Sequence, residues 1–253
     1  MPRLPASQRL AAIAVAATES FGRVGYRGTL TADVAAKAVM SAGSLFTYVE
    51  SKEALFHLVF LNGLGQLPEA PLALPLATPE PGETAALIER ALREIPVPLV
   101  RAALAGEEPA DVAGELRAIV EELYDLMAQY WPLLAVIERC AAELPWLDSL
   151  WFGQARAGVY AELAEYLLRR TASGRLRPMP DAMVAVRAVG ELVALFAWHR
   201  HEEPRDAGLY DDQAARRTVI EFICAALVPE NDPPNSVPKE HQSSTRAGAR
   251  APH

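Results

Sequence analysis

Apolar positions near the start of the chain recur every three or four residues, the period of one helix face. From Gln8 to about Val24 this face holds Leu10, Ile13, Ala14, Ala17 and Phe21. Ser7 stands just before the run, where a hydroxyl can accept a hydrogen bond from an unpaired amide of the first turn. The pattern predicts a helix over residues 8–24 whose apolar stripe faces a core.

Three further hydroxyls mark the starts of short helical segments. Thr29, Ser41 and Ser51 precede runs over residues 30–38, 42–49 and 52–66, so predicted N-caps fall about 10 residues apart. Segments this short do not form a self-sufficient helical hairpin. They suit a helix-turn-helix, in which the second short helix is presented to a DNA major groove while the first packs behind it.

The rest of the chain repeats the helical period, with interruptions. Five prolines fall within residues 67–83, where we expect a loop lying on the body of the protein. Helical signals resume at Thr84, and longer helices are predicted over residues 111–130, 132–143, 147–171, 181–200 and 211–228. Pro132 and Pro145 are among the predicted breaks. No alternating strand pattern competes, so the predicted fold class is all-α.

The segment from Phe21 to Leu55 resembles the DNA-binding head of the TetR family of bacterial transcriptional regulators. The matching residues are Phe21, Gly25, Tyr26, Thr29, Asp33, Val34, Ala35, Ala38, Ser41, Gly43, Ser44, Leu45, Tyr48, Ser51, Lys52, Glu53 and Leu55. The resemblance covers the head, and the remainder is similar to the family only in being helical. It implies a three-helix head joined by a fourth helix to a larger helical body that binds a ligand and dimerises.

Three positions depart from the family pattern. Val39 replaces the turn glycine, Phe46 replaces a tyrosine, and Val49 replaces the aromatic residue before Ser51. If the turn needs a positive φ, a β-branched residue there is strained, and a turn of another geometry would avoid that strain. Phe46 lacks a hydroxyl that could reach a phosphate. These departures bear on operator contacts more than on the fold.

The resemblance and the helical pattern together divide the chain into four parts. We expect a helix-turn-helix DNA-binding domain at 1–50, a connecting helix at 51–66 and a helical regulatory and dimerisation domain at 67–228. Residues 229–253 are rich in proline, serine and asparagine with almost nothing to bury, which predicts a disordered tail.

Charge and cysteine content favour a cytoplasmic DNA-binding protein. The net charge is −8, but residues 1–67 hold six basic and four acidic residues, so the remainder carries −10. Phosphate repels such a body and leaves the head facing DNA. Cys140 and Cys224 lie in apolar helical contexts without metal-ligand spacing, which favours a reducing compartment. The N-terminus also lacks the continuous apolar run of a signal peptide, and no apolar run reaches about 18 residues without a charge or proline. We therefore expect neither export nor a membrane partner.

No enzyme motif is present in the sequence. The five histidines stand outside an H-E-x-x-H frame, and no P-loop, G-x-G-x-x-G or G-x-S-x-G sequence occurs. We therefore expect no catalytic residue, no metal and no cofactor.

The candidate DNA contacts lie in and around the second short helix. They are Arg27, Thr29, Lys37, Ala42, Gly43, Ser44, Thr47, Tyr48 and Lys52. The helix itself offers only small and hydroxyl groups, without the arginine or asparagine that makes bidentate contacts to bases. Readout would then rest on methyl contacts, hydroxyls, DNA shape and cations at the edge. Capping, packing or solvation explains several of these residues equally well.

Aromatic residues gather in the body, where a ligand pocket needs apolar walls and a few polar groups. The candidate lining residues are Met127, Trp131, Glu138, Trp151 and Phe152. Aromatic core packing is the alternative for each of them. The sequence leaves open whether the effector is cationic or a lipid-like molecule.

Small residues recur along two body helices, interleaved with aliphatic ones. The candidate dimer contacts are Ala157, Ala161, Ala164, Leu168, Val189, Leu192 and Phe196. Small residues at this spacing let helices approach closely, either within one subunit or in a two-fold four-helix interface. The resemblance favours the interface.

These inferences lead to one expected function and one alternative. We expect a repressor that binds a palindromic operator as a homodimer and is released by a small, largely apolar molecule. The alternative is a helical regulator whose degenerate DNA-binding head acts through a protein partner, since basic residues are absent from the second short helix.

Overall fold

The computed structural model describes residues 5–67, 73–94, 97–202 and 208–230, and within them the chain is helical without a strand. The helices are α1 (Ala6–Gly28), α2 (Thr31–Lys37), α3 (Ala42–Leu45), α4 (Lys52–Gly63), α5 (Glu83–Glu94), α6 (Pro98–Ala105), α7 (Val112–Ala141), α8 (Pro145–Asp148), α9 (Arg156–Ala172), α10 (Ala182–Ala194), α11 (Arg200–Glu202) and α12 (Asp212–Leu227). Two π-helical segments, η1 (Ser149–Ala155) and η2 (Leu195–His199), continue α8 into α9 and α10 into α11. The predicted all-α class is confirmed, and the predicted tail lies outside the described residues except for its first two.

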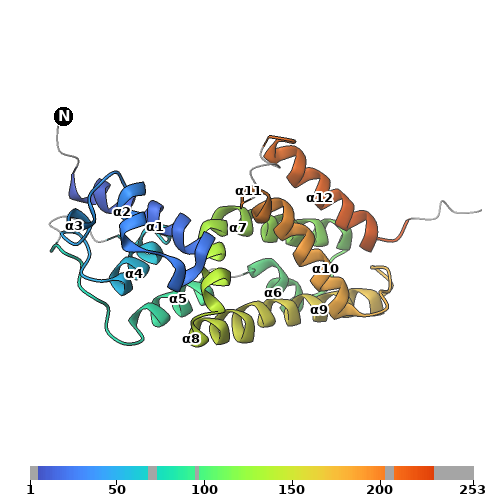
Figure 1. Ribbon diagram of the computed structural model, residues 1–253. Helices are drawn as coiled ribbons and strands as arrows, with labels where there is room; N and C mark the ends of the chain where they lie inside the picture. The colour runs from blue at the N-terminus through green and yellow to red at the C-terminus, as the bar shows by residue number, and fades with distance from the viewer. Residues whose placement is uncertain (1–4, 68–72, 95–96, 203–207, 231–253) are drawn as a thin grey trace, which may run out of the picture.

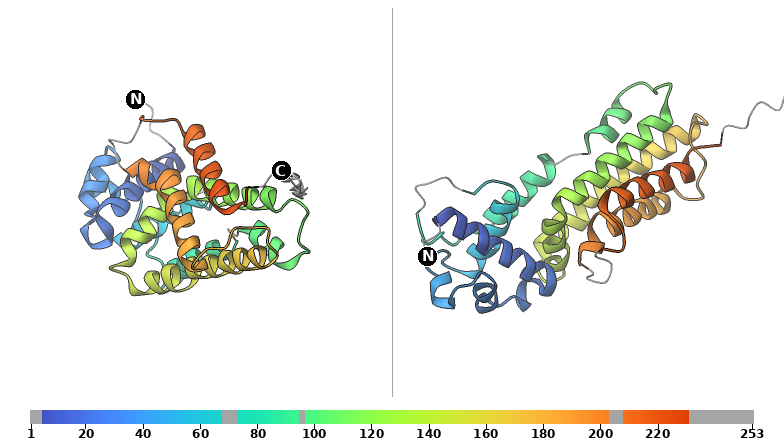
Figure 2. Two further views of the ribbon diagram at one scale, coloured as in Figure 1. Left: turned by 90° about the vertical axis from the view of Figure 1, so that its right-hand side faces the viewer. Right: turned by 90° about the horizontal axis from the view of Figure 1, so that it is seen from above.

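The molecule is elongated, with α1 to α4 forming a head at one end and α9, α10 and α12 lying toward the other (Figure 1 and Figure 2). The predicted stripe of α1 is buried in the head, together with Phe56 and Phe60 of α4. Phe21 and Phe56 meet edge to face at 5.1 Å between ring centroids. The apolar face of α1 therefore organises the head as its period predicted.

Two of the predicted helix caps are confirmed and two are wrong. The Ser44 amide donates to Ser41 Oγ at 3.1 Å, and the Ala54 amide donates to Ser51 Oγ at 3.0 Å. Ser7 does not cap α1, which begins one residue earlier after Pro5. Thr29 does not cap α2, because its hydroxyl donates backward to the Gly25 carbonyl at 2.8 Å.

The misassigned cap follows from a break in α1. Gly25 has φ 80°, a value that glycine adopts without steric cost, and a Cβ there would collide with the Glu143 carboxylate. The Gly25 carbonyl accepts both the amide and the hydroxyl of Thr29, which ends α1. Leu30 then precedes α2 without any side-chain cap.

The turn between α2 and α3 keeps the geometry that glycine would take. Val39 has φ 55°, in the left-handed region, and its side chain is 86% exposed. The conformation costs roughly 1–2 kcal/mol for a residue with a Cβ. The valine is thus accommodated with backbone strain rather than by a turn of another shape.

One long helix, α7, replaces the two helices predicted on either side of Pro132. A proline inside a helix removes a hydrogen bond and costs roughly 3 kcal/mol or more. Packing on both sides of the proline outweighs this cost: Ile119 and Leu123 lie in the body core, while Val136 and Cys140 lie in the core shared with the head. The result is a continuous element running from the body into the head.

The chain after α4 folds back onto the head, so the prediction that it lies on the body is wrong for its described part. Val49 and Leu76 form an isolated parallel bridge. The Leu76 amide donates to the Tyr48 carbonyl at 2.8 Å, and the Glu50 amide donates to the Leu76 carbonyl at 3.0 Å. Leu74 also packs against the head core. Residues 68–72 of this loop lie outside the described residues.

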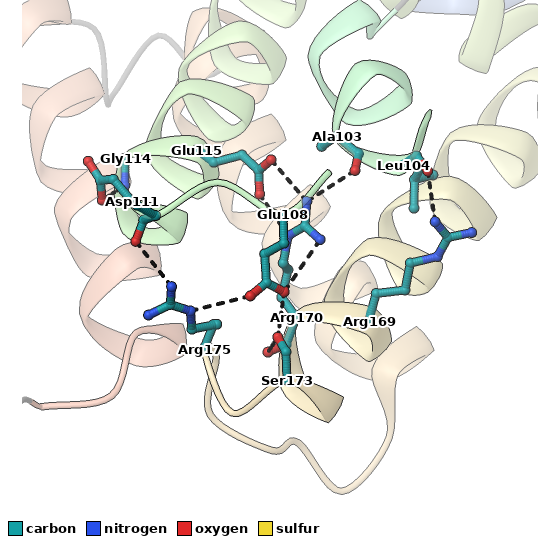
Figure 3. A network of polar contacts seen from close by, with 11 residues as sticks. Ala103, Leu104, Glu108, Asp111, Gly114, Glu115, Arg169, Arg170, Ser173 and Arg175 are labelled. Atoms are coloured by element: carbon teal, nitrogen blue, oxygen red, sulfur yellow. Dashed lines mark hydrogen bonds and ion pairs between the residues drawn. The ribbon is translucent and has the colours of Figure 1, made fainter. Parts of the chain in front are cut away.

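At the far end of the body a buried arginine joins three helices (Figure 3). Arg170 of α9 is 4% exposed and donates to both Glu115 oxygens, at 2.8 and 3.0 Å. Its Nη2 also donates to the Ala103 carbonyl of α6 at 3.0 Å. Glu108 lies 3.6 Å from its Nη1 and accepts from Ser173 at 2.6 Å. These contacts fix α6, α7 and α9 relative to one another.

Candidate DNA-binding surface and ligand cavity

The short helix α3 presents small residues to solvent. Leu45 within it is buried, and so is Val49 after it, which anchors both ends in the head core. The predicted contact residues Ala42, Gly43, Ser44 and Thr47 are all exposed. The structure therefore brings the predicted base-reading positions together on one surface.

The hydroxyls on this surface are already engaged within α3. Ser41 Oγ and Ser44 Oγ lie 2.8 Å apart, and the Thr47 hydroxyl donates to the Ser44 carbonyl at 2.7 Å. A hydroxyl oxygen keeps acceptor capacity after it donates. Thr47 is thus positioned to accept a hydrogen bond from a base amino group.

Of the three predicted cations, two contact other groups of the protein, and Arg27 has no side-chain partner within the part of the chain that the structure describes. Arg27 is exposed at the end of α1. Lys37 lies 3.3 Å from Glu19. Lys52 donates to the Arg27 carbonyl at 3.3 Å and sits 5.0 Å from the centroid of the Tyr26 ring. Surface pairs of this kind contribute at most about 1 kcal/mol, so a phosphate can compete for Lys37.

Two other predicted contacts are less accessible. Thr29 is 1% exposed, so its side chain does not reach the surface, which corrects its assignment as a DNA anchor. Tyr48 is half-buried and packs against the head core.

Two of the residues that depart from the family pattern, Val39 and Phe46, are exposed, which the sequence did not predict. Val39 precedes α3 and Phe46, 45% exposed, follows it. Leu30, at 59%, adds a third apolar group on the helix-turn-helix. Hydrophobic periodicity could not flag them, because the same residue types fill cores.

The head is joined to the body chiefly through the end of α7, a contact that sequence reasoning missed. Arg139 donates to the Arg23 carbonyl from Nε at 3.1 Å and from Nη2 at 3.0 Å. Glu143 accepts from the Arg27 amide. Cys140 lies beside them with its thiol 3.8 Å from the Phe21 carbonyl, and burial raises the pKa of that thiol to about 12. A movement of α7 would therefore displace the end of α1.

A cavity of about 630 Å³ lies between the head and the body helices. Its walls come from α4 to α7, α9, α10 and both π-helical segments. Phe60 of α4 and Leu64 just after it line the cavity from the head side, and Met127, Glu138 and Trp151 line it as predicted. Volumes of 300–1,000 Å³ are usual for small-molecule sites. π-Helical turns are frequent at functional sites, and here both border the cavity.

The cavity also has polar lining groups, and the predicted Glu138 is one of them. Glu138 accepts from Trp151 Nε1 at 3.2 Å and from Arg156 Nη1 at 3.0 Å. Arg156 lies 5.5 Å from the centroid of Tyr160, whose pKa is raised by burial. The indole N–H of Trp198, another lining residue, is buried and has no hydrogen-bond partner among the described residues. The lining is thus mostly apolar, with charged groups contributed by α5, α6, α7, α9 and α10.

Two predicted lining residues lie elsewhere. Trp131 is turned away from the cavity and stacks on His201 at 5.3 Å between ring centroids. Phe152 is exposed and faces Arg156 at 4.9 Å. Both are neighbours in sequence of lining residues, but helix rotation places them on another face.

The predicted dimer contacts are divided between the core and the surface. Ala164 is buried within the subunit, and Val189, Leu192 and Phe196 pack partly against the body core. Ala157 and Ala161 are exposed, and Leu168 is 60% exposed. Four of the seven residues therefore pack within the subunit, and three face solvent.

The run Ala182–His199 is long and apolar enough to cross a membrane by length and composition alone, and 33% of it is buried within the subunit. It contains Arg187 and Glu191, which form an ion pair at 2.7 Å. Core helices of soluble proteins satisfy the same criterion. Its exposed apolar positions include Val184 and Leu195.

Comparison with known proteins identifies the head. Residues 13–59 match the family model for bacterial regulatory proteins of the tetR family. No curated protein sequence matches the chain. The matched region contains α2, α3 and most of α4, together with much of α1.

Several solved structures resemble the chain at low sequence identity. The fatty acid degradation regulator FadR from Bacillus halodurans is 16% identical over 88% of this chain and 97% of its own, with a TM-score of 0.45. AibR in complex with isovaleryl coenzyme A and operator DNA is 16% identical over 85% and 97%, with a TM-score of 0.48. From the match to the family model, residues 13–59 carry the DNA-binding helix-turn-helix of bacterial regulatory proteins of the tetR family.

Proposed function

We propose that this regulator is a non-enzymatic, cytoplasmic repressor that binds a palindromic operator as a homodimer and is released by a small, largely apolar molecule. Residues 1–50 would bind DNA, residues 51–66 would connect, and residues 67–228 would bind the effector and dimerise. Small and hydroxyl groups of α3, with Arg27 and Lys37 at its edge, would face the major groove.

One observation carries the proposal: the cavity shares its walls with the elements that hold the head. Phe60 belongs to α4, and Leu133 and Ile137 belong to the part of α7 that shares a core with α1. A molecule that fits better when these helices move would shift the head. Release is limited by the effector's preference between the two states, typically about 1–3 kcal/mol.

The homodimer is supported by the unpartnered face of α9 and α10. Leu168 of α9, Val184 of α10 and Leu195 at the start of η2 are exposed apolar residues. A two-fold axis through this face would cover them and place two heads on half-sites about 34 Å apart. Leu168→Glu should convert the dimer to a monomer in sedimentation velocity. Phe222→Glu on α12, which alters a residue 67% exposed, is the matched control and should leave the dimer intact.

Selection from random DNA tests the operator. The purified protein should enrich a palindrome, and its affinity should fall steeply with salt because bound phosphates release counterions. Replacing thymine by uracil in the selected site removes the methyl groups alone, and the affinity should fall if methyl contacts supply the readout. A pool without any enriched sequence would refute operator binding.

Competition at the cavity tests the effector. Compounds that bind should weaken operator affinity, and Met127→Trp, which fills the cavity, should abolish the response. Trp131→Phe is the control, because Trp131 lies next to the lining residues but stacks on His201. Operator affinity that stays constant with every bound compound would exclude release by a ligand.

The exposed apolar residues of the head favour one second candidate. Val39, Phe46 and Leu30 could dock a protein partner instead of DNA. In that case no footprint would form, and any residual DNA binding would lack the steep salt dependence.

A further inference from the structure

We propose that residues 73–79, here named the strap, position the end of the DNA-reading helix and couple it to the α5 wall of the cavity. The proposal rests on the proposed function, since it takes α3 as the DNA-reading helix. It adds the residues that hold α3 in place and a route between ligand and DNA that bypasses the α1–α7 contact.

One end of the strap is fastened to the residues that follow α3. Leu76 exchanges backbone hydrogen bonds with Tyr48 and Glu50, at 2.8 and 3.0 Å. The Thr78 amide donates to Glu50 Oε2 at 2.9 Å, and its hydroxyl donates to Ser51 Oγ at 2.7 Å. Ser51 also caps α4. The strap therefore fixes the backbone between the end of α3 and the start of α4.

The continuation of the strap forms part of the cavity. Thr84 Oγ1 lies 3.0 Å from His57 Nδ1, which ties the start of α5 to α4. Ile88, Ala91 and Leu92 of α5 line the cavity. Fewer than ten residues separate Thr78 from this wall, so a displacement of α5 pulls on the strap directly.

The DNA-reading helix depends on such support. α3 spans four residues, Ala42–Leu45, and a helix that short has no stability of its own. Leu45 and Val49 anchor this segment in the core, and the amides of residues 47–49 donate to carbonyls of α3 itself. The backbone bonds to Leu76, in contrast, tie the segment to a distant part of the chain. Without the strap, α3 would keep its place in the core and lose its fixed orientation.

Substitutions at Thr78 test the positioning role. Thr78→Pro removes the amide and the hydroxyl together, Thr78→Val removes the hydroxyl, and Thr78→Ser keeps both. On the duplex selected by the wild-type protein, we expect affinity to fall about tenfold for Thr78→Pro and about threefold for Thr78→Val, the range for one or two hydrogen bonds. Thr78→Ser should bind normally.

Two further readouts separate positioning from general destabilisation. Affinity for a duplex of unrelated sequence should stay within about twofold, because phosphate contacts supply non-specific binding. Exchange of the Glu50 amide, which the strap protects, should accelerate at least about tenfold in Thr78→Pro. Thr218→Val, an exposed threonine of α12, is the control for loss of a hydroxyl and should change nothing.

A double-mutant cycle tests the coupling. Ala91→Phe places bulk on the α5 wall, and Gly158→Leu places bulk on the α9 wall, where a Cβ at 158 meets open space. Ala91→Phe should weaken operator binding in the wild-type background. In the Thr78→Pro background, the same substitution should have at most a third of that effect. The effect of Gly158→Leu should be the same in both backgrounds.

Several results would overturn the proposal. A Glu50 amide that exchanges rapidly in the wild-type protein would mean the strap is not docked. Unchanged specific affinity in Thr78→Pro, with accelerated exchange, would remove its positioning role, and equal effects of Ala91→Phe in both backgrounds would remove the coupling. If the wild-type protein selects no duplex, the proposed function fails by itself, while the exchange measurement still reports on docking.

Discussion

The two ends of the helical body each contain an arginine, Arg170 and Arg156, and the two differ in their number of partners and in how tightly their surroundings are packed. At the end far from the head, Arg170 is 4% exposed and its donors reach two carboxylates and a backbone carbonyl (Figure 3). At the end next to the head, Arg156 has one carboxylate partner, Glu138, beside a cavity of about 630 Å³. The first arrangement locks three helices together, and the second leaves room for a ligand and for movement.

The backbone follows the same division. Both π-helical segments border the cavity, whereas α9 is regular where it carries Arg170. A π-turn widens the helix and weakens its packing against neighbours. We conclude that stability is concentrated at the closed end and adjustability at the cavity end.

The largest expected difference comes from removing each arginine. Arg170→Met leaves Glu115, whose side chain is only 16% exposed, without this partner, which should lower the free energy of unfolding by roughly 3–5 kcal/mol. Arg156→Met breaks a partly exposed pair and should cost about 1 kcal/mol or less. Urea denaturation of both variants measures the contrast, and equal losses would break the comparison.

Hydrogen exchange should show the same contrast without mutation. Amides of Ser149–Ala155 and Leu195–His199 should exchange roughly 100-fold faster than those of residues 163–170, because local opening costs less where packing is loose. Comparable protection in both regions would mean that the cavity end is as rigid as the closed end.

Added bulk should be tolerated at one end and not at the other. Ala164→Leu overpacks the closed core and should cost about 1–3 kcal/mol. Gly190→Ala would bring a Cβ within 2.8 Å of the Tyr160 hydroxyl, but that ring borders the cavity and can move into it. Replacing a helical glycine by alanine gains about 1 kcal/mol, so this variant should be neutral or slightly more stable in thermal melts.

The smallest expected effect is on the decline of stability at acidic pH. At the closed end, the hydrogen bond from Ser173, followed by contacts with Arg175 and Arg170, lowers the pKa of Glu108. Below the ordinary carboxyl value of 4.5 the unfolded chain binds more protons at this residue, so stability falls as pH falls. Glu108→Gln should flatten the decline measured by urea denaturation between pH 6 and pH 4. An unchanged slope would show that other carboxylates dominate.

The sequence by itself determined the features that depend on neighbouring residues. The α1 stripe, the caps at Ser41 and Ser51 and the exposed residues of α3 follow from period and local hydrogen bonding, which operate within a few residues. Three of the five predicted lining residues, Met127, Glu138 and Trp151, also line the cavity. The head could be predicted from the sequence because the residues of its motif are close together in the chain.

Tertiary structure alone decided the rest. Packing of α7 in two cores carried the helix through Pro132, and the pairing of Leu76 with Tyr48 and Glu50 drew the loop onto the head. The break at Gly25 redirected the Thr29 hydroxyl, and helix rotation moved Trp131 away from the cavity. In each case the deciding partner lies far away in the sequence or depends on which helix face meets a neighbour, and neither local propensity nor spacing contains that information.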